Sequence, residues 1–228
     1  MPSVKNRSKT KQNITTTNKQ QLLFPLIALA LILWVLYRLL FNFSTFFDET
    51  IGKAVFFALP VAFYVAIAND RKILTSFSQQ KIKAGLLYGL AVGGLFGFVF
   101  AILAVLRQEA SFDAEPVYLT SWFWRELALA VLTSFWETLF FFTFFQTVLM
   151  DNYKHWSLTK QAVITAFVFL FFHLANIFNN FTGQQIIFTA SLLFSFALGQ
   201  ALFFSQLRNA YAAMVIQTIW GMVLLVYF

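Results

Sequence analysis

Residues 127–150 read LALAVLTSFWETLFFFTFFQTVLM, an apolar stretch in which Glu137 is the one charged residue. A helix of about 20 mainly apolar residues spans the hydrocarbon core of a bilayer. Within that core every backbone N–H and C=O must find a partner inside the chain, and an α-helix provides those partners. The stretch therefore predicts a membrane-spanning helix that carries a single acidic side chain.

The composition of the whole chain indicates the same fold class. Of its 228 residues, 60% are hydrophobic and only 11% are charged, and the mean hydropathy is +0.73. A soluble domain carries charge at roughly a quarter of its positions. The absence of cysteine excludes disulfides and thiolate chemistry. We expect an all-α, polytopic membrane protein whose main partner is the lipid bilayer.

Several further apolar stretches have the length that a membrane crossing needs. The second of them is the weakest, because Pro60 interrupts it. Together they predict one transmembrane helical domain, residues 22–228, of about seven helices. The predicted spans are 22–40, 51–68, 84–106, 127–150, 161–178, 186–204 and 210–228.

The positive charges flank the apolar stretches, which is how a membrane protein sets its orientation. They give no sign of a nucleic-acid surface, although the net charge is +7. Residues 1–21 are basic and almost free of large apolar side chains, so we expect a disordered tail, followed by a retained first span. The distribution predicts a cytoplasmic amino terminus in the cell membrane. Cations assigned to the inner side are Lys5, Arg7, Lys9, Lys11, Lys19, Arg71, Lys72, Lys81, Lys83, Lys154, Lys160 and Arg208; those assigned to the outer side are Arg38, Lys53, Arg107 and Arg125.

Glycine recurs at every fourth position of the third predicted span, at Gly85, Gly89, Gly93 and Gly97. Residues four apart share one face of a helix. A face without side chains lets a neighbouring helix approach closely in a membrane. We interpret this glycine stripe as a packing surface without chemistry of its own.

Ionisable residues inside a span are the main functional signal, because hydrocarbon should exclude them. Glu137 and His173 fall at comparable depth in consecutive, antiparallel spans, so each is the other's expected partner. A carboxylate and an imidazole around one water form a general-base pair; a hydrogen-bonded pair that only joins two helices fits the spacing equally well. The other acids are expected in loops or at span edges: Asp48, Glu49, Asp70, Glu109, Asp113, Glu115, Glu126 and Asp151.

Three sequence patterns in the second half resemble those of the CPBP family, the CAAX proteases and bacteriocin-processing enzymes also called Abi. The run from Glu137 to Thr143 resembles the first family motif, EExxxR, and residues 169–173, FLFFH, match the second, FxxxH. The third, HxxxN, aligns with residues 217–221. The resemblance implies a CPBP-like helical bundle over about residues 125–228.

The resemblance also implies a function, that of an intramembrane endopeptidase that cleaves a peptide or a prenylated protein. Glu137 and His173 would activate water, and Gln217 would donate a hydrogen bond to the substrate carbonyl as it becomes an oxyanion. The secondary candidates are Thr138, which replaces the second Glu of the first motif, and Asn176, which shares the helical face of His173. Phe142 replaces the motif's Arg and Gly221 its Asn.

The same replacements leave other functions open. Catalytic zinc takes three protein ligands, and only Glu137, His173 and Asn176 are at hand, so we expect no metal and no other cofactor, although the family is often labelled metalloprotease. One alternative is a catalytically inactive relative, acting as a membrane immunity, binding or scaffold protein. Another is a small proton-coupled transporter, against which the absence of other charges inside the spans counts.

Overall fold

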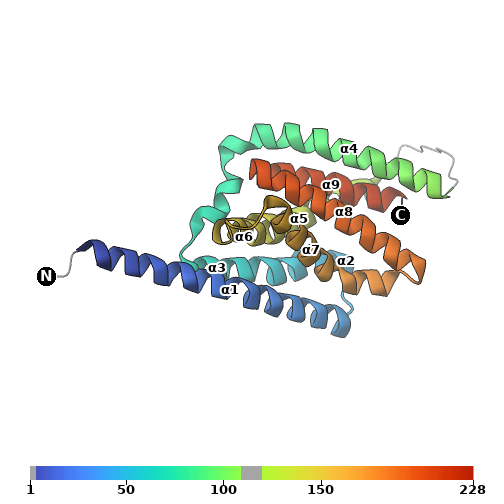
Figure 1. The fold of residues 1–228 in the computed structure, drawn as a ribbon. Coiled ribbons are helices and arrows are strands. Elements are labelled where there is room, and N and C mark those ends of the chain that lie inside the picture. Colours follow the sequence, from blue (N-terminus) through green and yellow to red (C-terminus); the bar gives the residue numbers. More distant parts are fainter. Residues whose placement is uncertain (1–3, 109–119, 228) are drawn as a thin grey trace.

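The computed structural model describes residues 4–108 and 120–227, and this part of the chain is built of helices without a strand (Figure 1). Glu109, Asp113 and Glu115, which we expected in a loop, lie outside the described residues. The long helices run roughly alongside one another and are joined by short connections. The elements are α1 (Val4–Leu40), α2 (Thr45–Phe47), α3 (Leu59–Ala68), α4 (Ile82–Gln108), α5 (Ser121–Glu137), α6 (Thr147–Asn152), α7 (Leu158–Asn180), α8 (Gln184–Leu207) and α9 (Ala210–Tyr227).

Two of the membrane-spanning segments are composite. The second joins α2 to α3 through two π-helical stretches, η1 (Asp48–Gly52) and η2 (Ala54–Ala58). The fourth joins α5 to α6 through the π-helical stretch η6 (Thr138–Gln146). Short 3₁₀ helices, η3 (Arg71–Phe77) and η4 (Gln79–Lys81), lead into α4.

The prediction of an all-α polytopic membrane protein is confirmed. Within the described residues, six helical segments are long and apolar enough to cross a membrane, and a shorter apolar segment, Ala210–Val223 in α9, accompanies them. The second segment runs over Thr45–Ala68 and so begins earlier than the predicted 51–68. Pro60 did not break it, because Pro60 lies in the first turn of α3, where a missing N–H is tolerated.

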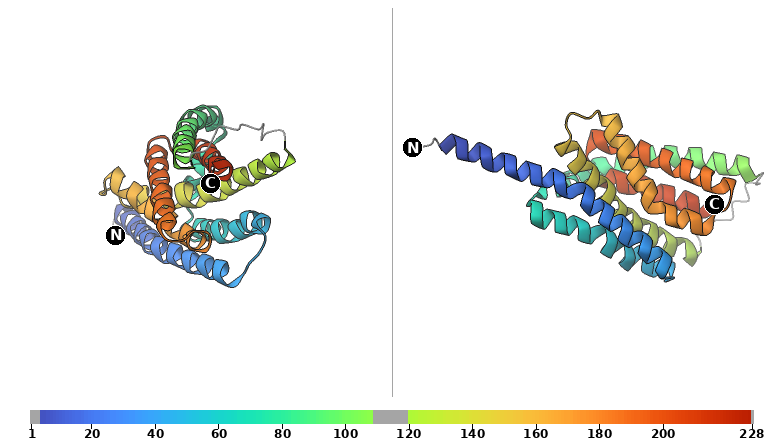
Figure 2. Two further views of the ribbon diagram at one scale, coloured as in Figure 1. Left: turned by 90° about the vertical axis from the view of Figure 1, so that its right-hand side faces the viewer. Right: turned by 60° about the horizontal axis from the view of Figure 1, so that its bottom comes forward.

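The basic segment differs from our expectation of a disordered tail. Helix α1 begins at Val4 and runs without interruption into the first span, so the segment is helical in the structure and extends beyond the bundle (Figures 1 and 2). Lys and Gln, which are frequent there, are good helix formers. A helix already nucleated in the adjoining span extends at little further free-energy cost.

The centre of the bundle is the run from Glu137 to Met150, in which every residue is buried. Other helices pack around it, including α7, α8, α9 and the second span. A helix that is apolar on all sides is buried, either against lipid or, as here, among other helices. The phenylalanines of this run, among them Phe140, Phe141 and Phe144, are fully buried. The stretch that first indicated a membrane helix is therefore the core of the fold.

Polar contacts join several connections at one end of the bundle. The Lys81 ammonium donates to the backbone carbonyl of Arg208 at 2.8 Å, and the Arg208 guanidinium pairs with Asp151 at 3.2 Å. Lys81 and Arg208 were both predicted on the inner side of the membrane. Their contacts agree with that assignment.

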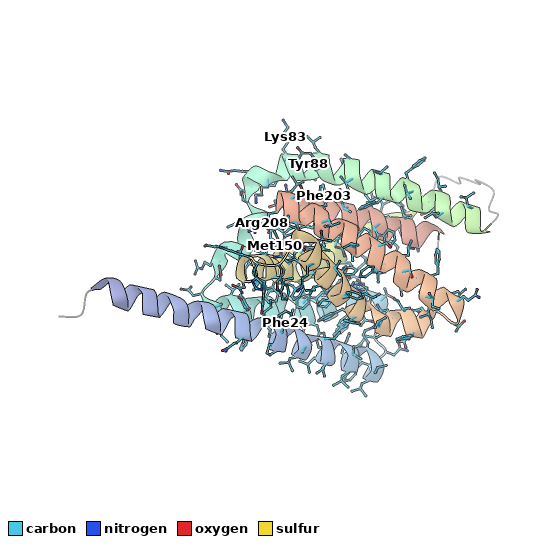
Figure 3. All side chains as sticks on the ribbon, in the orientation of Figure 1. Phe24, Lys83, Tyr88, Met150, Phe203 and Arg208 are labelled. Carbon is cyan, nitrogen blue, oxygen red and sulfur yellow. The ribbon has the colours of Figure 1, made fainter. Side chains whose placement is uncertain are left out.

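Helix α4 packs along α9, and the glycine stripe forms the contact. Gly85, Gly89, Gly93 and Gly97 are all buried. A Cβ added at Gly93 would lie 3.0 Å from the Cα of Ile216, and one at Gly89 would lie 3.1 Å from the carbonyl oxygen of Ala212. Lys83 and Tyr88 lie on the outer side of α4 (Figure 3). The packing role predicted for the stripe is confirmed.

We expect Gly93→Leu to destabilise the protein, because its side chain would force α4 away from the backbone of α9. Overpacking of this kind typically costs about 1–3 kcal/mol. Gly94→Leu is the matched control, since a Cβ at Gly94 meets nothing within 4 Å. Thermal unfolding in detergent should show a lower melting temperature for Gly93→Leu alone. Equal melting temperatures for the two variants would contradict the packing assignment.

Candidate active site

Glu137 lies at the end of α5 and is 3% exposed, with its carboxylate directed to side chains from three other helices. Its Oε1 is 2.5 Å from the ammonium nitrogen of Lys53 and 3.4 Å from Nε2 of His173. Its Oε2 accepts a hydrogen bond from the amide of Gln217. The expected approach of Glu137 to His173 is therefore present, and Gln217 belongs to the same cluster.

Lys53 is the member of this cluster that sequence reasoning missed. It is 5% exposed, and its ammonium lies 2.5 Å from both Glu49 and Glu137. We had counted Lys53 among the cations of the outer side, near the beginning of the predicted span 51–68, and had placed Glu49 at the span edge. Since the helix begins at Thr45, Glu49 lies inside the span as well. The i, i+4 spacing of an acid and a base next to an apolar run was the signal available.

The buried ion pair corrects two further predictions. Glu137 is not the one acid inside a span, because Asp48 and Glu49 lie in the second span. Charged groups that could belong to a proton relay are also present inside the spans, since Glu49 and Lys53 adjoin Glu137. A charge in hydrocarbon is tolerated when it is paired, and the sequence distance between Lys53 and Glu137 concealed this pairing.

Helical turns of π type adjoin both charged partners. The stretches η1 and η2 lie on either side of Lys53, and η6 begins directly after Glu137. The stretches η2 and η6 contact each other across the bundle. A π turn places its residues differently from an α turn, and such turns are frequent at functional sites. Local helix geometry thus coincides with the charged cluster.

The orientation of His173 is fixed by Phe169, four residues earlier in α7. Nδ1 of His173 lies 2.8 Å from the carbonyl oxygen of Phe169, and the two rings stack with their centroids 4.3 Å apart. A carbonyl oxygen can only accept, so Nδ1 carries the proton and donates it. Nε2 lies 3.4 Å from a carboxylate oxygen of Glu137 and donates to it when both ring nitrogens carry a proton. Both residues of the FxxxH pattern therefore contribute to the placement of Nε2.

Gln217 connects Glu137 to a polar network between α8 and α9. One N–H of its amide goes to Glu137, and its Oε1 accepts from Gln200 at 3.4 Å and from Thr138 at 3.5 Å. Gln200 also donates to the carbonyl oxygen of Ala213 at 2.9 Å. An amide has two N–H donors, so one remains for a substrate. Thr138 supports Gln217, and the oxyanion role of Gln217 stays a prediction.

A cavity of about 270 Å³ adjoins the cluster. Its polar lining includes Glu49, Thr133, Glu137, His173 and Gln217. Apolar side chains, Trp220 among them, form most of the remaining wall. Thr45 and Glu126 also line it, so the cavity lies toward the end of the bundle where the second and fourth spans begin. The cluster thus lines a space of about 270 Å³ with mixed polar and apolar walls.

Other positions of the family patterns contribute less. Gly221 lines the cavity without a side chain, and Phe142 is buried among rings, with Phe169 and Phe204 as neighbours. Asn176 is not among the cavity-lining residues, and its Oδ1 is buried without a hydrogen-bond partner in the described structure. The described residues therefore bring together Glu137, His173, Gln217 and Thr138, with Asn176 apart from them.

The cluster does not fit a metal ion. No group of three or more His, Asp or Glu side chains in the described part of the chain is arranged to hold one. The ammonium of Lys53 lies between Glu49 and Glu137, in the position that a cation would take between the two carboxylates. Two positive charges there would repel each other.

The ion pair should be a major contribution to stability, because a single buried partner left alone is an uncompensated charge. We expect Lys53→Met to destabilise the protein by about 3–5 kcal/mol, and Glu137→Gln added to it to recover part of that loss. A double-mutant cycle from thermal unfolding in detergent would measure the coupling. Lys83→Met removes an exposed cation and serves as the control. If Lys53→Met unfolds at the same temperature as Lys83→Met, the pair does not stabilise the bundle.

The comparisons with known proteins give no relative for this cluster. No protein-family model, no curated protein and no solved structure matches the chain.

Proposed function

We propose that this protein is an intramembrane endopeptidase of the CPBP kind, in which His173 and Glu137 activate a water molecule. One observation carries the proposal: His173 lines the cavity, and its Nε2 lies 3.4 Å from a carboxylate oxygen of Glu137. A general base needs a free lone pair within reach of the proton that it takes. Nε2 meets this requirement once Nδ1 is bound to Phe169.

The roles within the pair follow from the other contacts of Glu137. Its carboxylate already accepts hydrogen bonds from Lys53 and Gln217, so His173 is the better placed proton acceptor. Nε2 would take a proton from water while the water oxygen attacks the substrate carbonyl carbon. The positive charge of the imidazolium formed would then be stabilised by the nearby carboxylate of Glu137.

The second half of the reaction returns that proton. The tetrahedral intermediate collapses, the C–N bond breaks, and the imidazolium donates the proton to the leaving amine. The N–H of Gln217 that is not bound to Glu137 would support the oxyanion. Water adds one O–H to the new carboxyl group and one proton to the amine, so the hydrolysis balances without a further reactant.

The orientation of the bundle in the cell membrane, and the side from which a substrate enters, are also part of what we propose. Cations at the Lys81 and Arg208 end of the bundle favour the cytoplasm for that end, and with it the amino terminus, in the cell membrane. The cavity lies toward the opposite end, near Thr45 and Glu126. A peptide or membrane-protein segment would then enter from the outer half of the bilayer.

A second candidate, an inactive relative that binds a peptide or membrane partner, is favoured by a different observation. Lys53 holds Glu49 and Glu137 together at 2.5 Å on each side. A carboxylate bound in this way joins helices. This structural role is enough to explain why the ion pair is present, without any catalysed reaction. In this alternative the cavity would serve recognition alone.

We expect His173→Ala to lower peptide cleavage by about a hundredfold or more, because it removes the proton acceptor. Glu137→Gln should lower it as well, since the imidazolium loses its counter-charge. Purified protein in liposomes would be given prenylated and unmodified peptides, and cleavage followed by mass spectrometry. His155→Ala, at the chain's other histidine, is the matched control and should cleave normally.

Two outcomes would separate the candidates. Cleavage that is unchanged in His173→Ala would eliminate the proposed mechanism. A lack of cleavage by the unmodified protein, together with peptide binding that survives in both variants, would support the binding role instead. Thermal unfolding of each variant shows whether a lost activity reflects a lost fold.

A further inference from the structure

A groove away from the candidate site runs between α1 and α7 on the outside of the bundle. Its walls are apolar side chains of both helices, and it encloses about 330 Å³. Both helices belong to membrane-spanning segments, so the groove faces hydrocarbon. From Leu31 to Leu39 it extends over roughly 12 Å of α1. Val35, Leu174 and Phe178 also line it.

At one end the apolar groove meets a polar pocket of about 350 Å³. Leu39 and Asn179 line both, so the two spaces adjoin each other. The polar pocket also contains Arg38, Asn42 and Asp48. Arg38 lies in the last turn of α1, where the membrane-spanning segment ends. The polar pocket is therefore at the depth of lipid headgroups, directly beside the apolar groove.

Arg38 has hydrogen-bonding capacity left in this pocket. One terminal nitrogen donates to Asp48, and Asp48 also accepts from the hydroxyl of Tyr37 at 2.5 Å. Nε of Arg38 is buried and has no hydrogen-bond partner in the described structure. A guanidinium carries five N–H donors in a planar fork that matches phosphate oxygens. Because Nε is enclosed by the protein, a phosphate group in the pocket would accept from the terminal N–H groups that Asp48 does not use.

We infer that the groove between α1 and α7, together with the pocket at Arg38, is a binding site for a glycerophospholipid. The acyl chain lies along Val35 and Phe178, and the phosphate accepts from Arg38. The neighbouring amides of Asn42 and Asn179 contact the glycerol or the headgroup. This site is independent of the proposed peptidase activity, since no residue of the Glu137 cluster lines it.

The inference is tested by lipid binding to the full-length protein after delipidation in detergent. Native mass spectrometry would compare dioleoyl phosphatidylglycerol, dioleoylglycerol and inorganic phosphate. We expect phosphatidylglycerol to bind about tenfold more tightly than dioleoylglycerol, because it adds a charged hydrogen bond. Inorganic phosphate, which lacks the acyl chains, should not bind. Equal binding of the two lipids would overturn the assignment of the phosphate to Arg38.

Two pairs of variants separate the polar pocket from the groove. Arg38→Gln should remove the preference for phosphatidylglycerol, whereas Arg125→Gln, at another arginine paired with an acid, should keep it. Val35→Phe fills the groove without touching the Arg38–Asp48 pair and should weaken the binding of both lipids. Leu36→Phe, on the same helix but outside the groove, should leave the binding of both lipids unchanged. If each variant binds like its control, lipid covers the bundle without a specific site and the inference is wrong.

Discussion

The ion pair of Lys53 and Glu137 is the interaction on which the arrangement of the bundle depends. Either side chain alone would be a charge in a low-dielectric interior, so the second and fourth spans must meet where these residues lie. Glu49 shares the ammonium of Lys53, and Gln217 binds the remaining carboxylate oxygen. Three helical segments are thereby fixed to one another at a single depth. Apolar packing by itself would allow the same helices many registers, because one phenylalanine contact resembles another.

The rest of the bundle supports this cluster by placing its members. The glycine stripe lets α4 lie close against α9, the helix that carries Gln217. Trp34 of α1 donates to the backbone carbonyl of Phe172 at 2.8 Å, one residue before His173. These two contacts help to fix the positions of α9 and α7, the helices that carry Gln217 and His173. The large aromatic core around Phe140 and Phe141 fills the space behind the cluster and excludes water from that side.

The same interaction shapes the chemistry that the cavity can support. Because the carboxylate of Glu137 is already bound to Lys53, the imidazole becomes the natural proton acceptor, and the carboxylate a counter-charge for it. The ammonium also takes the position that a metal ion would need. A water-activating pair without a metal and a structural ion pair beside a binding cavity are therefore the two functions closest to this geometry. They differ in whether Nε2 of His173 ever receives a proton from water.

The sequence by itself determined the fold class, because helix length, apolar content and the glycine repeat are local properties of a chain in a bilayer. It also singled out Glu137 and His173, since ionisable residues at mid-span stand out against hydrocarbon. Only the tertiary structure brought Lys53 to Glu137, because their contact joins residues far apart in the chain, and a charge near a span end is equally consistent with the surface. The sequence likewise could not separate Asn176 from the cluster or assign the lone pair of His173. Both depend on how α7 is rotated in the bundle, and that rotation is decided by packing against its neighbours.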